Sequence, residues 1–118
     1  MESISKASTW SKLLYEFIGT AIMVYSFNSS SDPLNVRARP MAYFILWILA
    51  YKISGAHFNP ATSIAAFIIE GKCMNGLGLF LTIIAQCVGA WLGIALGYLL
   101  IKDYLGNYDL LPNLIFGY

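Results

Sequence analysis

The chain has 118 residues, of which 58% are hydrophobic and 11% are charged, and its mean hydropathy is +0.67. A soluble domain carries about 25% charged residues, so this composition favours an integral membrane protein whose main partner is the lipid bilayer. The net charge of +1 lacks the basic excess of nucleic-acid-binding proteins, so no nucleic-acid partner is expected.

Leu13–Phe27 is the first apolar segment, and Glu16 is its only charged residue. With Trp10 as an interfacial anchor, the segment predicts a transmembrane helix. A polar connector follows over residues 28–40. Within it, the Asp32-Pro33 pair is suited to cap and start the next helix.

Met41–Ile53 is the second apolar segment. As a helix it is only about 20 Å long, which is short for a hydrocarbon core of ~30 Å. Either the helix begins near Pro33 and carries Arg37 and Arg39 toward the interface, or it does not cross the bilayer fully. The residues alone leave both alternatives open.

Two further segments complete the pattern. Ser54–Asn59 is expected to be irregular, and Pro60–Ile69 makes about 15 Å of helix, roughly half of the hydrocarbon core. Leu77–Ile101 contains no charged residue and is long enough to span the core with some tilt. The pattern predicts an all-α membrane protein with three transmembrane helices plus one re-entrant half-helix.

Residues 1–101 are expected to form this membrane domain, and residues 102–118 a C-terminal tail that ends in apolar residues. Cys73 and Cys87 are predicted to be free thiols, with Cys87 packed as a small hydrophobic residue. A small residue at every fourth position of the last span predicts a smooth stripe for close helix packing. The stripe consists of Ala85, Gly89, Gly93 and Gly97.

The sequence offers no nucleophile–base pair and no cluster of metal ligands. Its single histidine has no cysteine or acid at ligand spacing, so we predict no metal site. We also predict no cofactor and no enzymatic activity.

The stretch "SGAHFNPATS" (54–63) contains a helix-breaking polar pair between two apolar segments. Irregular backbone is tolerated in lipid only where protein buries it or it lines an aqueous cavity. Asn59 suits the N-cap of the following helix, and Pro60 suits its first position. The positive end of that helix then points at the bilayer midplane and disfavours cations and protons there.

Three stretches resemble the aquaporins, the major intrinsic protein family. "SGAHFNPATS" (54–63) is similar to the family's first pore loop, "YEFIGT" (15–20) to the start of its first helix, and "AQCVGAWLG" (85–93) to its third helix. Order and spacing agree as well, so that the resemblance covers nearly all of residues 13–101.

The resemblance implies a role for each matching residue, and these roles fall into three groups. The residues that match the pore motif are Asn59, Pro60 and Ala61. The residues that match the pore-lining loop are Ser54, Gly55, Ala56 and His57, although a hydrogen-bonded loop histidine is an equal alternative for His57. The residues that match polar braces of the loop are Glu16 and Gln86, for which bracing is preferred over a proton relay.

Several features depart from the family pattern. The sequence holds one Asn-Pro-Ala motif, whereas a complete aquaporin has two inverted halves that meet at the midplane. The second motif and the arginine that follows it do not occur here. Arg39 stands where many water channels have an aromatic residue, and Lys52 stands where the family often has an uncharged one.

Two functions follow from this pattern. The preferred expectation is a non-conducting accessory subunit of a larger membrane complex, bound to other membrane-protein subunits. The alternative is a channel for water or a small neutral solute, rebuilt by an antiparallel second copy or by a separate second aquaporin half. The sequence leaves the particular membrane open, an organellar inner membrane included.

Overall fold

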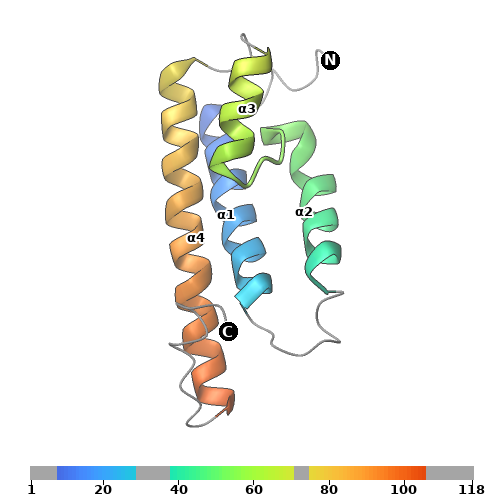
Figure 1. Ribbon diagram of the computed structural model, residues 1–118, viewed down its shortest axis with the longest axis vertical. Coiled ribbons are helices and arrows are strands. Elements are labelled where there is room, and N and C mark those ends of the chain that lie inside the picture. Colours follow the sequence, from blue (N-terminus) through green and yellow to red (C-terminus); the bar gives the residue numbers. More distant parts are fainter. Residues whose placement is uncertain (1–7, 29–37, 71–74, 106–118) are drawn as a thin grey trace.

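The computed structural model describes residues 8–28, 38–70 and 75–105, and all regular structure in these ranges is helical. The helices are α1 (Thr9–Asn28), α2 (Ala38–Ser54), α3 (Pro60–Glu70) and α4 (Gly76–Leu105). No strand occurs in the described ranges, which confirms the all-α part of the prediction (Figure 1).

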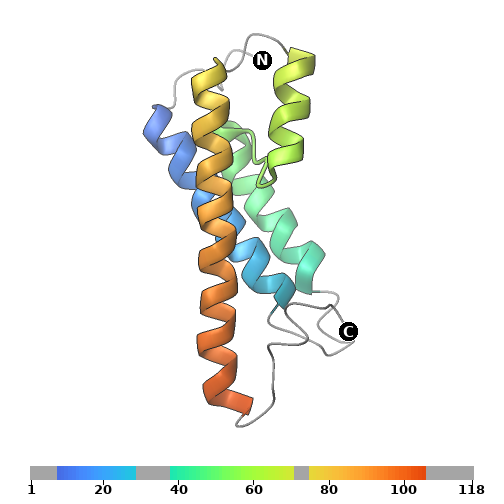
Figure 2. The ribbon, with the colours of Figure 1, turned by 60° about the vertical axis from the view of Figure 1, so that its left-hand side comes forward.

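α1 lies between α4 and α2, and it packs most extensively against α4. α3 is the shortest helix and lies beside the N-terminal half of α4 (Figures 1 and 2). After α2 the chain turns back between the helices, so α3 begins part-way along the bundle. This turn brings the residues of the Asn-Pro-Ala motif into the middle of the molecule.

Two helices begin at polar N-caps that our sequence reading did not identify. The backbone N–H of Ser11 donates to the Ser8 hydroxyl over 3.2 Å at the start of α1. The backbone N–H of Gly78 donates to the Asn75 side-chain oxygen over 2.7 Å at the start of α4. Each cap satisfies a backbone donor that the first helical turn leaves without an intrahelical partner.

The helices otherwise match their predicted segments with longer ends. α2 begins at Ala38, so Arg39 lies in its first turn, and Ser54 is its last helical residue rather than part of the irregular segment. The proposed Asp32-Pro33 start lies outside the described residues, as do Arg37, Cys73 and most of the tail.

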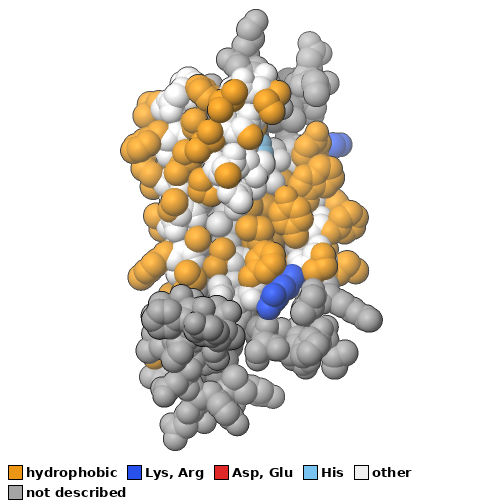
Figure 3. All heavy atoms as spheres, viewed as in Figure 1, with side chains coloured by type: hydrophobic (Ala, Val, Ile, Leu, Met, Phe, Trp, Pro, Cys, Tyr) orange, Lys and Arg blue, Asp and Glu red, His pale blue; other side chains and the backbone are white. Residues whose placement is uncertain are grey.

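The interior of the bundle is rich in polar side chains and its surface is apolar. The largest fully buried side chains are Phe58, Gln86, Glu16 and Ser63, three of which are polar or charged. Large hydrophobic side chains are instead exposed along all four helices, and Figure 3 shows them dominating the surface of one face. This inverted distribution fits a protein whose surrounding solvent is hydrocarbon, in which buried polar groups must bond to each other.

One described helix is long and apolar enough to cross a membrane by length and composition. This segment is Gly76–Leu100, with a mean hydropathy of 2.1, and Pro60–Ile69 is a shorter apolar helix. The predicted spans in α1 and α2 do not meet the same test in the described residues. Three transmembrane helices therefore remain a prediction.

Two glycines of α4, Gly89 and Gly93, face the backbone of α1. A methyl group on Gly89 would overlap the carbonyl oxygen of Phe17, and one on Gly93 would overlap that of Ala21. Both contacts are with backbone, which no rotamer change can relieve. Gly97 is different, since a methyl group there would lie 3.9 Å from its nearest neighbours, at ordinary contact distance. Ala85, at the start of the stripe, is half-buried.

Cys87 lies on the outer side of α4 rather than in the core. Its side chain is exposed and the thiol is free, so the expectation that it packs inside was wrong. Helical spacing explains the error, because Gln86, Gly89 and Gly93 fill the inward face and leave Cys87 beside exposed Val88.

Candidate functional site: a polar loop held by one carboxylate

The segment between α2 and α3 has an unusual backbone. Gly55, Ala56 and Phe58 have φ values of 94°, 53° and 48°. Positive φ costs a residue with a side chain roughly 1–2 kcal/mol, because Cβ crowds the backbone. Ala56 and Phe58 therefore hold a conformation that their surroundings must enforce.

Hydrogen bonds to the Glu16 carboxylate hold the loop in this conformation. Its Oε1 accepts hydrogen bonds from the Ser54 hydroxyl (2.6 Å) and from the backbone N–H of His57 (3.0 Å). Its Oε2 accepts from the backbone N–H of Phe58 (2.7 Å) and from the Gln86 side-chain amide (2.8 Å). The carboxylate is 1% exposed, so α1, the loop and α4 are joined at one buried group.

Consecutive backbone N–H groups that converge on one anion form a nest, a concavity that binds negative charge. Here the N–H groups of His57 and Phe58 converge on Glu16. The N–H of Ala56 bonds to the Ser54 hydroxyl, and that of Gly55 bonds to the carbonyl of Tyr51. Each backbone donor from Gly55 to Phe58 thus has a partner inside the protein.

The backbone carbonyls of the loop, unlike its N–H groups, lack partners among the described residues. The carbonyl oxygens of Gly55, Ala56 and His57 accept no hydrogen bond in the part of the chain that the structure describes. With all donors turned inward, the loop leaves acceptors for water or a solute.

Ser63 joins the network from α3, although the sequence reading gave it no role. Its fully buried hydroxyl accepts from the Gln86 amide over 2.9 Å and lies 3.1 Å from Nδ1 of His57. Its local signal, a hydroxyl residue in an otherwise apolar helix, is shared with the exposed Thr62 and does not single Ser63 out.

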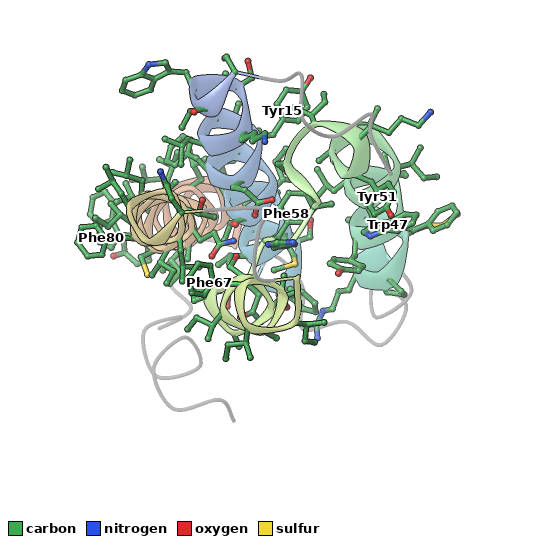
Figure 4. The ribbon with its side chains drawn as sticks, turned by 90° about the horizontal axis from the view of Figure 1, so that it is seen from above. Tyr15, Trp47, Tyr51, Phe58, Phe67 and Phe80 are labelled. Atoms are coloured by element: carbon green, nitrogen blue, oxygen red, sulfur yellow. The ribbon has the colours of Figure 1, made fainter. Side chains whose placement is uncertain are left out.

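Phe58 packs the loop against α1. Its side chain is 1% exposed, and its ring lies on Gly19, where any side chain would overlap it. The ring of Tyr43 on α2 meets it edge-on, with centroids 6.4 Å apart. Figure 4 shows Phe58 pointing into the centre of the bundle, whereas Trp47 and Tyr51 lie on α2 away from it.

Replacing Gly19 with alanine should displace this ring. We expect Gly19→Ala to lower the free energy of unfolding by about 1–3 kcal/mol, the range for overpacked cores. Denaturation in detergent would measure the change. Gly76→Ala is the control, since a methyl group there would meet nothing within 4 Å, and equal stability of the two variants would contradict this packing.

Asn59 caps α3 at the inner end of the loop. Its side-chain oxygen accepts from the backbone N–H of Ala61 over 2.9 Å, while Pro60 occupies the first helical position. The amide NH2 group therefore points away from the helix, and it donates to no group in the described residues. Because Asn59 and Ala61 are exposed, this donor is open to a passing solute.

A cavity of about 230 Å³ lies between the helices at the same end of the bundle as the loop. Its lining is mixed, and the polar residues in it are Thr9, Lys12 and Glu16 of α1, Ser54 and His57 at the loop, and Asn75 and Thr82 near the start of α4. No group of three or more histidine, cysteine, aspartate or glutamate side chains that could hold a metal ion occurs in the described residues.

A family model described as "Major intrinsic protein" matches residues 3–113. The chain belongs to the major intrinsic protein family. Among curated relatives, the glycerol uptake facilitator protein of Pseudomonas aeruginosa is 30% identical over 121 residues, which cover 93% of this chain and 43% of that protein. The glycerol uptake facilitator protein of Haemophilus influenzae is 28% identical, with 86% and 42% covered. Aquaporin-2 of Rhizopus delemar is 28% identical, with 83% and 34% covered.

No solved structure matches this major intrinsic protein chain. The chain spans about two fifths of the length of the first two relatives. Family members are integral membrane channels rather than enzymes, so this chain is an integral membrane protein of a channel family.

Arg39 and Lys52, the two departures from the family pattern, occupy different settings. The Arg39 guanidinium carbon lies 5.7 Å from the centre of the Phe27 ring, a cation–π contact between α2 and α1. Lys52 is exposed in the last turn of α2, where a positive charge complements the helix dipole.

Proposed function

We propose that this chain supplies one half of a pore for water or small neutral solutes. In this proposal α1, α2 and α4 cross the bilayer, and α3 is a re-entrant half-helix that aims its N-terminus at the midplane. α3 has 11 residues and is therefore about 16 Å long, which suits half of the hydrocarbon core.

The observation that carries the proposal is the orientation of the Asn59 amide. Its oxygen is fixed to the Ala61 N–H, so its two N–H donors face outward beside carbonyls that lack partners. A neutral solute with oxygen acceptors and hydroxyl donors can bond to both. The positive end of α3 at the same point disfavours cations.

A pore needs a second half to enclose it. α2 and α3 expose apolar side chains, among them Phe44, Ile48, Ile64 and Ile68, and in this proposal the second half covers part of this surface. The second half would come from an antiparallel copy, from another chain or from further residues of a longer polypeptide. The names of the relatives make glycerol a suitable test solute beside water.

Osmotic flux tests the proposal. We expect liposomes that carry the protein with its second half to shrink faster than empty liposomes, and Asn59→Asp to reduce that rate at least several-fold. The substitution keeps the capping oxygen but replaces the NH2 donor with a charged acceptor, which neutral solutes must then pass. Light scattering after an osmotic step would measure the rate.

Ser8→Asp is the matched control. Ser8 also caps a helix through its side-chain oxygen and does not line the cavity beside the loop, so the same negative charge falls on a second N-cap away from the proposed solute path. We expect it to leave the flux unchanged. Flux equal to that of empty liposomes, or equal loss in both variants, would contradict the pore proposal.

An accessory role is the second candidate, and Arg39 is the observation that favours it. A cation in the first turn of α2 opposes the helix dipole, and that turn contains no acidic residue. The positive charge of Arg39, held against the Phe27 ring, is better suited to binding a neighbouring subunit than to the passage of neutral solutes. Arg39→Leu separates the roles: loss of a co-purifying subunit supports the accessory role, and raised flux supports the pore.

A further inference from the structure

The buried network around Glu16 has a fixed direction of hydrogen-bond donation. An ionised carboxylate only accepts, so the group of Gln86 that faces Glu16 must be its NH2. The second hydrogen of that NH2 points at Ser63, whose hydroxyl oxygen lies 2.9 Å away. Ser63 therefore accepts from Gln86 and keeps one hydrogen of its own to donate.

That hydrogen has one destination among the described residues. Thr20 and Ser26 donate to the carbonyl oxygens four residues before them, but Ser63 makes no such bond. The acceptor within reach is Nδ1 of His57, at 3.1 Å. Ser63 is 0% exposed, and a buried hydroxyl without an acceptor is unfavourable, because it has given up its hydrogen bond to water.

We propose that Ser63 is a positioning residue that holds the neutral His57 ring as its Nε2–H tautomer. With the Nδ1 lone pair occupied by the Ser63 hydroxyl, the ring proton must lie on Nε2. The tautomer is thus set by a chain of donors that begins at Gln86 and ends at the loop.

The consequence is a donor where the ring meets the cavity. Nε2 of His57 has no protein acceptor in the described residues, and His57 lines the cavity beside the loop. The ring therefore offers N–H to water or to a solute oxygen and has no free lone pair with which to take up a proton. If the chain forms part of a pore, as in the proposed function, on which this step rests, the Nε2–H group selects solute atoms that accept hydrogen bonds. It also interrupts proton transfer along the line of water molecules.

Nitrogen NMR of the ring tests the tautomer directly. The chain contains a single histidine, so ring-labelled protein in detergent or lipid gives one pair of nitrogen signals without assignment. The expected spectrum at neutral pH has a protonated Nε2 and an unprotonated, hydrogen-bonded Nδ1. A spectrum dominated by the Nδ1–H form, or by a doubly protonated ring, would overturn the proposal.

Ser63→Ala gives the second readout, and Thr62→Ala is its control. Thr62 is the neighbouring, exposed hydroxyl on α3, so its loss should leave the tautomer unchanged. Ser63→Ala should raise the Nδ1–H form to a comparable fraction, and a ring that stays wholly Nε2–H would contradict the positioning role. If Ser63→Ala fails to fold, the wild-type spectrum alone decides. Neither measurement depends on flux, so the pore proposal and the tautomer can fail separately.

Discussion

Glu16→Ala should release the loop between α2 and α3 and lower the free energy of unfolding by about 3 kcal/mol or more. The substitution leaves the backbone N–H groups of His57 and Phe58 without an acceptor, together with one donor of Gln86. Each buried donor left unsatisfied costs about 1–3 kcal/mol. The positive φ values at Ala56 and Phe58 then lose the contact that compensates their strain.

Hydrogen exchange at the His57 and Phe58 amides would measure this release, beside denaturation in detergent. We expect both amides to lose protection in Glu16→Ala, while amides in the middle of α4 keep theirs. Glu16→Gln should have an intermediate effect, because its one oxygen still accepts but its NH2 faces another donor. Unchanged protection of the two amides in Glu16→Ala would show that other contacts hold the loop.

Gly93→Ala should separate α1 from α4 and destabilise the protein by about 3 kcal/mol, at the upper end of the range for overpacking. The added methyl group would overlap the carbonyl oxygen of Ala21 and lie 3.1 Å from the backbone nitrogen of Tyr25. Because these are backbone atoms, only a shift of whole helices makes room. Close packing of small residues is one of the contributions that hold helices together in lipid, where no hydrophobic force draws them together.

Gly97→Ala is the matched control on the same stripe. The methyl group there meets the side chains of Asn28 and Tyr25 at 3.9 Å, and alanine favours the helix by about 1 kcal/mol. We expect this variant to be as stable as the wild type or slightly more so in denaturation experiments. Equal destabilisation by both substitutions would mean that the stripe acts through glycine flexibility rather than through close approach.

The helical segments could be predicted because each is marked by a pattern of residues that lies within the segment itself. The apolar segments, the Asn-Pro pair and the small-residue stripe are read within one or two turns, and α3 begins at Pro60 as predicted. Helix starts were less predictable. Thr9 stands beside the Ser8 cap and suits an N-cap nearly as well, whereas Asn75 stands between Met74 and Gly76 and was a local signal that our predictions did not use. The outward position of Cys87 was itself predictable, because the stripe that includes Gly89 and Gly93 marks the packing side of α4 and Cys87 lies off that side.

The residues of the candidate site also fall into those that the local sequence predicts and those that it does not. The Asn59 cap is local, so its chemistry followed from the motif, whereas Glu16 and Gln86 gained their roles through resemblance to a family. Ser63 and Phe58 were missed because their contacts join separate elements: Ser63 bridges α4 and the loop, and Phe58 fills the space above Gly19. Such contacts arise only once the loop has folded back between the helices.

The mass of the native assembly tests the central claim, that this chain forms one half of a pore, most directly. The protein would be released gently from its membrane and weighed by native mass spectrometry, with co-migrating chains identified. The pore proposal predicts a small complex in which each Asn-Pro-Ala half is matched by another, from a second copy, another chain or a longer polypeptide. A large complex of unrelated subunits, or a lone chain with its loop face uncovered, would contradict it.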